Sequence, residues 1–235
     1  MGLPRVVIAS TGDELRQPGE PLGEASIYDS NRPMLLALAR QAGLATVDGG
    51  CIPDNRAAIA ERLSDFAALA DLIVTTGGAS VGEADHSVTA LATAEAPFAV
   101  LKMAVKPGKP AIIGHLGQAA YLGLPGNPVA ALVSWLTLGN AMIAALSGTA
   151  WRRRRGSSVP VISTFERGPG RNEFVPARLV ATDVGTRLEI LGRGGSARLK
   201  PLIHADGLAE IDVEAGSIEP GDSVQFHPFR DGFTI

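Results

Sequence analysis

The sequence predicts an α/β fold: a three-layer domain built on a parallel sheet, followed by a small all-β, barrel-like domain. Up to about residue 148, short β-branched runs alternate with amphipathic helical stretches, which is typical of a parallel sheet with helices on both faces. Beyond the arginines at 152–155, short alternating runs are separated by turn residues, without helical periodicity. We expect an α/β domain over 1–148, a linker over 149–158 and a β domain over 159–235.

Each element has a local signal. Strands are expected at 4–10, 44–48, 71–76, 98–102, 111–114 and 119–124, and in the β domain within 159–165, 174–181, 187–191, 208–212 and 223–229. Ser30 can cap a helix that ends before Gly43, and Asp54 is the cap candidate for the next helix. A further helix is expected after Asp85, and Asn127 can cap the last one, with proline at its first position.

Composition excludes several classes of protein. The formal net charge of −3 and the pI near 5.8 argue against a nucleic-acid partner. The apolar stretch 128–146 is interrupted by polar residues and is interpreted as a core helix, so no membrane partner is expected, and no signal peptide is recognised. The single cysteine, Cys51, cannot form a disulfide within the chain, is consistent with the cytoplasm, and is expected to be a buried small hydrophobe.

Three glycine-containing loops, at 10–15, 75–85 and 124–128, follow predicted strands. Ligands of open α/β sheets bind at the carboxyl ends of the strands. Glycines let backbone N–H groups approach a phosphate, and a following helix N-terminus adds a favourable dipole. We interpret the loops as one site for a phosphorylated ligand, with plain tight turns as the alternative. The spacings of a Walker A or dinucleotide motif are absent.

Charged residues accompany these loops. Lys102, Lys106 and Lys109 surround a Pro-Gly turn, and such a fixed cationic cluster suits an oxyanion, although a solubilising hairpin is the alternative. Four acids lie within the loops or beside them: Asp13, Glu14, Asp54 and Asp85. A carboxylate near a phosphate needs a cation such as Mg²⁺ between them, or a ligand N–H to accept. Helix capping is the alternative role of the last two acids.

Six segments, in this order and spacing, resemble the molybdopterin molybdenumtransferase family, which includes bacterial MoeA and the E domain of gephyrin. They are Ser-Thr-Gly-Asp-Glu-Leu at 10–15, Ile-Tyr-Asp-Ser-Asn at 27–31, Pro-Asp-Asn at 53–55, Thr-Gly-Gly-Ala-Ser-Val-Gly-Glu-Ala-Asp at 76–85, Lys-Pro-Gly-Lys-Pro at 106–110 and Leu-Pro-Gly-Asn-Pro-Val at 124–129. Residues 150–235 resemble the family's C-terminal β domain more loosely. The family's N-terminal domains have no counterpart in this sequence.

The resemblance implies insertion of molybdate into adenylylated molybdopterin with release of AMP, assisted by Mg²⁺, in a cytoplasmic homodimer. It implies catalytic roles for Glu14, Asp54 and Asp85, with Glu14 and Asp85 as candidate Mg²⁺ ligands. Residues expected to bind the substrate are Thr11, Gly12, Asp29, Ser30, Gly77, Gly78, Ser80, Lys102, Lys106, Lys109, Pro125, Gly126, Asn127 and Pro128.

Two other functions remain open at this point. One is a molybdopterin-binding or carrier module without insertase activity. The other is a molybdopterin adenylyltransferase or nucleotide pyrophosphatase of the same fold, because fold alone does not decide the reaction.

Overall fold

The computed structural model describes residues 2–77, 89, 91–92, 96–153, 155–193 and 199–229. The chain divides into two compact units. The first, called the α/β unit, comprises Met1–Met103 and Pro110–Trp151, and the second, called the β unit, comprises Ala104–Lys109 and Arg152–Ile235. Residues 104–109, which lie within the expected first domain, therefore pack with the β unit.

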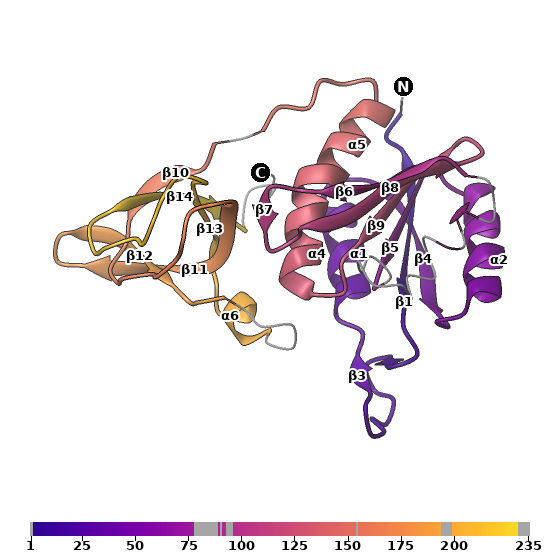
Figure 1. Ribbon diagram of the computed structural model, residues 1–235, viewed down its shortest axis with the longest axis horizontal. Coiled ribbons are helices and arrows are strands. Elements are labelled where there is room, and N and C mark those ends of the chain that lie inside the picture. The colour runs from indigo at the N-terminus through magenta and orange to yellow at the C-terminus, as the bar shows by residue number, and fades with distance from the viewer. Residues whose placement is uncertain are drawn as a thin grey trace. The chain divides into compact units, whose positions relative to one another are not determined.

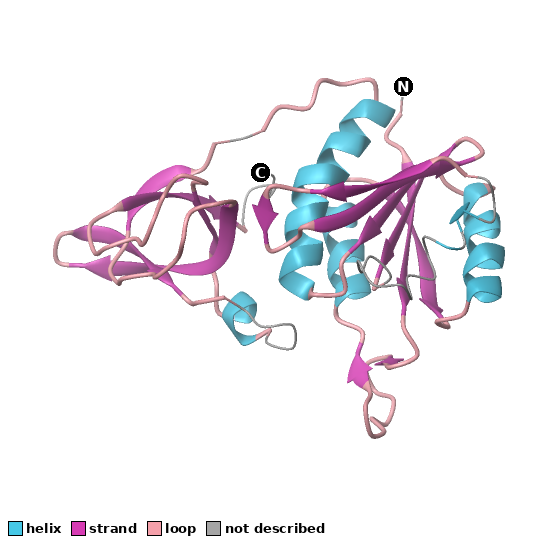
Figure 2. Cartoon of the chain, viewed as in Figure 1, coloured by secondary structure: helices cyan, strands magenta, loops and turns pink. Residues whose placement is uncertain are grey.

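A six-stranded sheet forms the centre of the α/β unit, in the order β4-β1-β5-β9-β8-β6 (Figures 1 and 2). Its strands are β1 (Arg5–Thr11), β4 (Ala45–Ile52), β5 (Leu72–Thr76), β6 (Phe98–Lys102), β8 (Pro110–Leu116) and β9 (Ala119–Leu124). The strands from β4 to β9 pair in parallel, as the sequence predicts, whereas β8 and β6 add an antiparallel edge. A two-residue connection joins β8 to β9, and so short a connection permits only antiparallel pairing.

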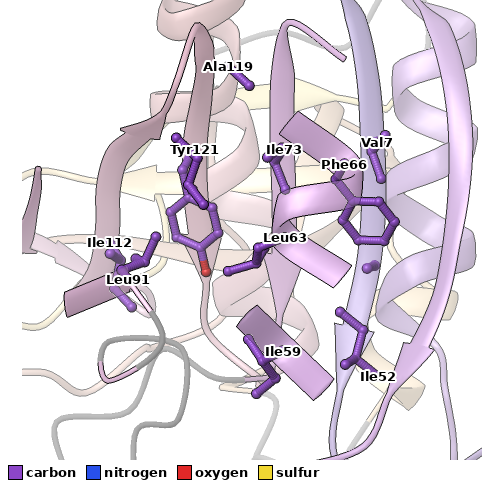
Figure 3. Packing of buried hydrophobic residues seen from close by; sticks show 12 residues of the cluster. Val7, Ile52, Ile59, Leu63, Phe66, Ile73, Leu91, Ile112, Ala119 and Tyr121 are labelled. Atoms are coloured by element: carbon purple, nitrogen blue, oxygen red, sulfur yellow. The ribbon is translucent and has the colours of Figure 1, made fainter. Parts of the chain in front are cut away.

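Helices cover both faces of this sheet, which confirms the predicted α/β fold (Figure 1). They are α1 (Asn31–Gln41), α2 (Arg56–Ala67), α4 (Pro128–Ser134), a π-helical turn (Trp135–Gly139) and α5 (Asn140–Leu146). Figure 3 shows how α2 buries Ile59, Leu63 and Phe66 against side chains from the sheet such as Ile73 and Tyr121. The opposite face is covered by α1, α4 and α5 (Figure 1).

The helix starts differ from the expected caps in two cases. Ser30 is the N-cap of α1 but makes no side-chain cap bond; instead Asp29 Oδ1 accepts the N–H of Arg32 at 3.2 Å. Asn55, not Asp54, caps α2, because its side chain accepts the N–H of Ala58 at 2.8 Å. The expected cap of α4 is confirmed, since Asn127 accepts the N–H of Ala130 at 3.0 Å.

The helical stretch 128–146 is long and apolar enough to cross a membrane by length and composition alone. Half of this stretch is buried inside the structure, as expected for a core helix. Trp135 is buried where the π-helical turn begins, and a Cβ at Gly139 would lie 2.7 Å from its indole ring. The small residue therefore lets the ring lie flat against the helix.

The β unit is built on one antiparallel sheet, which confirms the predicted all-β character of this region. Its elements are β7 (Val105–Lys106), β10 (Ser157–Pro160), β11 (Asn172–Thr182), β12 (Gly185–Ile190), α6 (Lys200–Ile203), β13 (Gly207–Ile211) and β14 (Ser223–Pro228). The order is β10-β14-β13-β11-β12, and β7 pairs in parallel with the start of β11. A bridge between Val161 and Leu188 joins the two edges, so the sheet curls into a barrel. The helical turn α6, not expected from the sequence, is too short to leave a periodic pattern.

The remaining two strands, β2 (Leu15–Arg16) and β3 (Ile27–Tyr28), pair with each other in the arm that follows β1. The side chains of Ile27 and Tyr28 are exposed on this arm. The arm returns the chain to the start of α1, and it thereby places Asp29 and Asn31 at the carboxyl end of the sheet.

The cap assignment of α2 leads to a stability prediction. Replacing Asn55 with alanine removes the side-chain acceptor for the N–H of Ala58 and should lower the free energy of unfolding by about 1 kcal/mol. Asp54→Ala, the matched control, should change it by less than about 0.5 kcal/mol, because this exposed side chain does not cap the helix. Denaturant unfolding of the two variants measures both values. A larger loss for Asp54→Ala would return the capping role to Asp54.

Candidate functional site

The three glycine-containing loops meet at the carboxyl ends of β1, β5 and β9. The N–H of Gly77, directly after β5, donates to the carbonyl of Leu124 at 3.3 Å. A Cβ at Gly77 would overlap the carbonyl oxygen of Thr11, and Gly77 has a φ of +115°. A Cβ at Gly126 would lie 3.6 Å from the Cα of Gly77. The backbones of the three loops therefore lie in contact, and the approach of Gly77 to Thr11 is too close for any side chain at position 77.

Acidic side chains gather beside the first loop. The carboxyl of Glu14 folds over Gly12, where a Cβ would lie 2.6 Å from Glu14 Oε2. Asp13 Oδ1 accepts the backbone N–H of Asp54 at 2.9 Å, so the loop before α2 is tied to the loop after β1. The Asp54 carboxylate receives no hydrogen bond from any residue that the structure describes.

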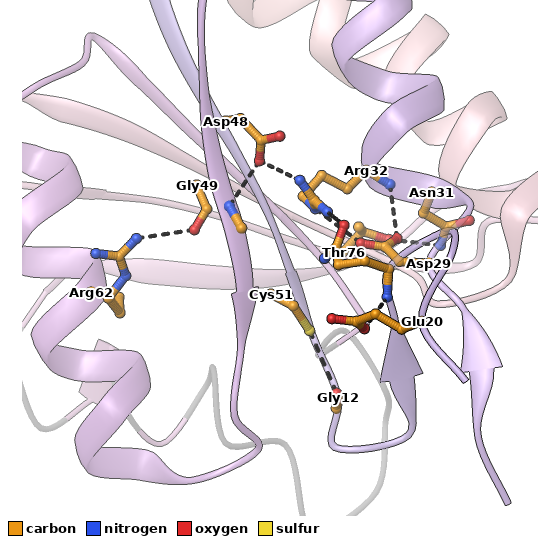
Figure 4. Close-up of polar contacts among 12 residues, drawn as sticks. Gly12, Glu20, Asp29, Asn31, Arg32, Asp48, Gly49, Cys51, Arg62 and Thr76 are labelled. Carbon is orange, nitrogen blue, oxygen red and sulfur yellow. Dashed lines mark hydrogen bonds and ion pairs between the residues drawn. The ribbon is translucent and has the colours of Figure 1, made fainter. Parts of the chain in front are cut away.

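The thiol of Cys51 lies near these acidic side chains. Its thiol is half-buried rather than buried, which corrects the sequence expectation, and its Sγ lies 3.6 Å from the carbonyl oxygen of Gly12 (Figure 4). Burial raises the pKa of the thiol, and the negative charges of Asp29, Glu14 and Asp13 raise it further, against the opposing charge of Arg32. The carboxyl end of β4 thus lies near three carboxylates, those of Asp13, Glu14 and Asp29.

A buried arginine holds the first turn of α1 in place (Figure 4). Arg32 Nε donates to Asp29 at 3.0 Å, one Nη donates to Gln17 at 2.5 Å, and the other pairs with Asp48. Burial lowers the pKa of Arg32, but the hydrogen bonds and charges of Asp48 and Asp29 outweigh it and raise the pKa overall. Arg32 is therefore committed to protein carboxylates.

Asp48 reaches Arg32 because the β1–β4 pairing is irregular beside it. The register shifts between Ile8 and Ala9, opposite the Asp48–Gly49–Gly50 segment. A Cβ at Gly49 would lie 2.8 Å from the ring of Phe66, so only glycine fits there. Burial alone would raise the pKa of Asp48, but the N–H of Gly50 and the Arg32 guanidinium lower it. Bulges of this kind commonly re-aim side chains beside functional sites.

Asn31, next to Arg32, joins two of the loops. Its Nδ2 donates to Thr76 Oγ1 at 2.9 Å and to the carbonyl of Gly126 at 2.8 Å, and Thr76 Oγ1 donates to the carbonyl of Pro125 at 3.0 Å. Buried oxygens of Ser10, Thr11 and Asn31 have no partner among the described residues. Such an atom costs about 1–3 kcal/mol when it is left unsatisfied. Three of the six such atoms found in the described part of the chain thus lie at this one edge, which favours a ligand site there over a purely structural role.

The predicted lysine cluster is divided between the units. Lys102 ends β6 in the α/β unit, whereas Lys106 and Lys109 belong to the β unit. Lys106 Nζ lies 3.2 Å from Glu173 Oε1, and Arg193 Nε contacts the same oxygen at 2.6 Å. Burial alone would raise the pKa of Glu173, but its hydrogen bonds and ion pairs with Arg193 and Lys106 lower it.

Three predicted site residues, Gly78, Ser80 and Asp85, lie outside the described residues. Among the residues that are described, no group of three or more His, Cys, Asp or Glu could hold a metal ion. The roles of the remaining predicted residues in binding or catalysis stay predictions.

Comparison with known proteins agrees with this geometry. Residues 7–145 match the family model described as "Probable molybdopterin binding domain", and 158–229 match "MoeA C-terminal region (domain IV)". The chain belongs to the molybdopterin-binding domain family. A molybdopterin molybdenumtransferase from Haemophilus influenzae is 33% identical over 229 residues, which is 96% of this chain and 56% of that protein. One from a Nostoc species is 39% identical over 150 residues, 63% of this chain and 34% of that protein.

Solved structures add support for the fold. The crystal structure of the molybdopterin biosynthesis protein MoeA from Pyrococcus horikosii superposes with a TM-score of 0.80 at 24% identity. The alignment covers 97% of this chain and 55% of that one. Nearly all of this chain matches the Haemophilus influenzae and Pyrococcus horikosii proteins, but it spans only about half of their length.

Sequence reasoning missed the residues that organise this molybdopterin-binding domain's edge. Asn31 stands in the motif at 27–31, so a signal was present. Asp29 pairs with Arg32 from just before the N-terminus of α1, where an acidic side chain is favoured. No local signal links Asp48 or Thr76 to them, since both partners are distant in the sequence.

The close approach at Gly77 yields a second prediction. Gly77→Ala should lower the free energy of unfolding by clearly more than about 1 kcal/mol, because the φ is positive and the new Cβ overlaps Thr11. Gly19→Ala is the matched control, since Gly19 has a φ of +97° with open space around it. Its smaller loss measures the backbone strain alone. Equal losses in denaturant unfolding would show that the contact with Thr11 is of no consequence.

Glu173 yields a pH prediction. Its folded-state pKa is lowered from an unfolded value of about 4.3, so its stabilising effect is complete above that pH and is lost as the pH falls through the folded pKa. The gap in melting temperature between the unmodified chain and Glu173→Gln should therefore be widest above about pH 5 and narrow on acidification.

Glu189→Gln provides the control for this series. Glu189 pairs with Arg178 at the surface, and such exposed pairs contribute little to stability, so the gap should be small at every pH. A gap for Glu173→Gln that stays constant down to about pH 3 would contradict the assigned pKa shift.

Proposed function

We propose that this chain binds adenylylated molybdopterin at the carboxyl edge of the α/β unit and takes part in inserting molybdate with release of AMP. The observation that carries the proposal is the meeting of three glycine loops beside a group of carboxylates in a molybdopterin-binding domain. The relatives named molybdopterin molybdenumtransferase support molybdenum cofactor biosynthesis as the process.

The glycine-containing loops would form the lining of the ligand site. Thr11, Gly12, Gly77 and Gly126, together with Gly78, Ser80, Pro125, Asn127 and Pro128, would line the ligand. The positive-φ glycines at 12 and 77 let the loop backbones come close, and the N-terminus of α4 adds a favourable dipole for phosphate. Asp29 and Ser30 close the site at the start of α1.

The carboxylates would meet the parts of the substrate that carry positive charge or N–H groups. Glu14, Asp54 and Asp85 are the proposed catalytic acids. Carboxylate oxygens suit Mg²⁺, and we propose that Glu14 and Asp85 hold the ion together with water and substrate phosphate, which neutralises charge as AMP leaves. Arg32 cannot serve the substrate phosphates in this role, because Asp29 and Asp48 already hold it.

The lysines would act on the anions. Lys102 extends from the α/β unit, while Lys106 and Lys109 stand on the segment that joins the β unit. Lys106 shares Glu173 with Arg193 and Arg167, so this carboxylate faces three cations and does not neutralise them all. We further propose a cytoplasmic homodimer, as the family resemblance implies, without nucleic-acid or membrane partners.

Two alternatives remain. The first is a carrier that holds molybdopterin without insertion, and it predicts substrate binding without AMP release. An adenylyltransferase or nucleotide pyrophosphatase would need only an α/β domain, and the match of the second region to a MoeA C-terminal region disfavours it. Pyrophosphate release from ATP with molybdopterin would indicate the adenylyltransferase.

The proposal is tested by AMP release from adenylylated molybdopterin in the presence of molybdate and Mg²⁺. We expect release by the unmodified chain, and at least a tenfold lower rate for Asp54→Asn without loss of stability, in line with the contribution of a general acid or base. Binding of the substrate without AMP release would favour the carrier. Absence of binding would remove the proposed site altogether.

A further inference from the structure

The two loops that flank the proposed ligand site are held at a fixed spacing by one side chain. Both hydrogens of Asn31 Nδ2 are used, one on Thr76 Oγ1 and one on the Gly126 carbonyl. Thr76 Oγ1 passes its own hydrogen to the Pro125 carbonyl, which completes a ring of hydrogen bonds between the loops after β5 and β9. Asn31 is 8% exposed, so water has little access to replace these bonds.

We propose that Asn31 is a positioning residue for the ligand. Its carboxamide sets the distance between the backbone of Gly77 and that of Pro125 and Gly126, and these segments form the proposed binding loops. This inference rests on the proposed function for the identity of the ligand. It goes beyond it by assigning ligand affinity to a residue that does not touch the ligand.

The chemistry of the ring requires an amide at this position. The two acceptors, the hydroxyl of Thr76 and the backbone carbonyl of Gly126, lie on separate loops. They need two N–H donors on one short planar group, and the asparagine carboxamide supplies both. Aspartate has the same shape but no such donor. The Oδ1 of Asn31 is buried without a partner among the described residues, so the contribution of the side chain lies in its two N–H groups.

Arg32, next to Asn31 in the sequence, makes this ring of hydrogen bonds rigid. Arg32, 5% exposed, is fixed by Asp29, Asp48 and Gln17, so the first turn of α1 cannot shift to follow a displaced loop. Arg32 thus anchors this turn to β4 and to the arm after β1, while Asn31 anchors it to the loops after β5 and β9 (Figure 4). Pre-organisation of this kind improves affinity because less ordering is left for the binding step.

The experiment compares Asn31→Asp with Asn140→Asp in the full chain. Asn140 Nδ2 donates to the carbonyl of Leu136 at 2.9 Å in α5, so its replacement removes a similar bond away from the loops. The probe is adenylylated molybdopterin. Its dissociation constant should rise about tenfold or more for Asn31→Asp, as expected from two lost N–H donors, and stay within about twofold for Asn140→Asp.

A second measurement reads the loops without ligand. Hydrogen exchange of the backbone amides at 77, 123, 124, 126 and 127 should quicken in Asn31→Asp and stay unchanged in Asn140→Asp, because only the former opens the ring. Melting temperatures of the two variants separate this effect from general destabilisation. If Asn31 has a merely structural role, the Asn31→Asp variant should have a lower melting temperature, while the folded variant binds the probe with an unchanged dissociation constant.

The outcomes are distinct. Faster exchange together with weaker binding supports the inference. Unchanged binding by Asn31→Asp, when the unmodified chain binds the probe, overturns it and leaves the proposed function intact. An unmodified chain that binds no probe overturns the proposed function and the ligand role of Asn31 together. Unchanged exchange in Asn31→Asp overturns the positioning role whatever the binding result.

Discussion

The proposed site depends on the contact between the ends of β1 and β5. Ser10 pairs with Thr76 in parallel register, and the next residue of β5, Gly77, turns so tightly that any side chain would overlap the carbonyl of Thr11. The third loop packs against this same glycine through Gly126. Since neighbouring parallel strands end at one edge, the close approach concentrates backbone groups where a ligand of an open α/β sheet binds.

The charged side chains at this edge are mainly acidic. Asp13, Glu14 and Asp29 all raise the pKa of Cys51, and carboxylates hold the guanidinium of Arg32. A second arginine, Arg16, donates to the backbone carbonyls of Asp13 and Leu15. The described part of this region therefore has an excess of negative charge. Such a field suits a bound cation or the N–H groups of a pterin, whereas a phosphate there must rely on backbone N–H groups and helix α4.

The sequence predicts the layers, the strand positions and the meeting of three loops, because hydrophobic periodicity and glycine chemistry are local signals. It does not predict the partners of Asn31 or Arg32, since Thr76, Asp48 and Gly126 become neighbours only after folding. The cap of α2 shows the limit of local reasoning: Asp54 and Asn55 are adjacent, both can cap, and only the backbone geometry selects Asn55. The antiparallel edge formed by β8 and β6 follows from a two-residue turn.

Lys106 belongs to the β unit, so the residues of the proposed site come from both units. The glycine loops, the acids at 13, 14 and 54 and the Asn31 ring all belong to the α/β unit, so the pterin part of the proposal requires that unit alone. Lys106 lies in β7, which pairs with β11, and it contacts Glu173, as do Arg193 and Arg167. Among the described residues, Glu173 thus contacts three cations, and we propose that an oxyanion would be attracted to this group. In the proposal, the pterin would therefore be bound by the α/β unit alone, whereas two of the three lysines that would act on anions, Lys106 and Lys109, belong to the β unit.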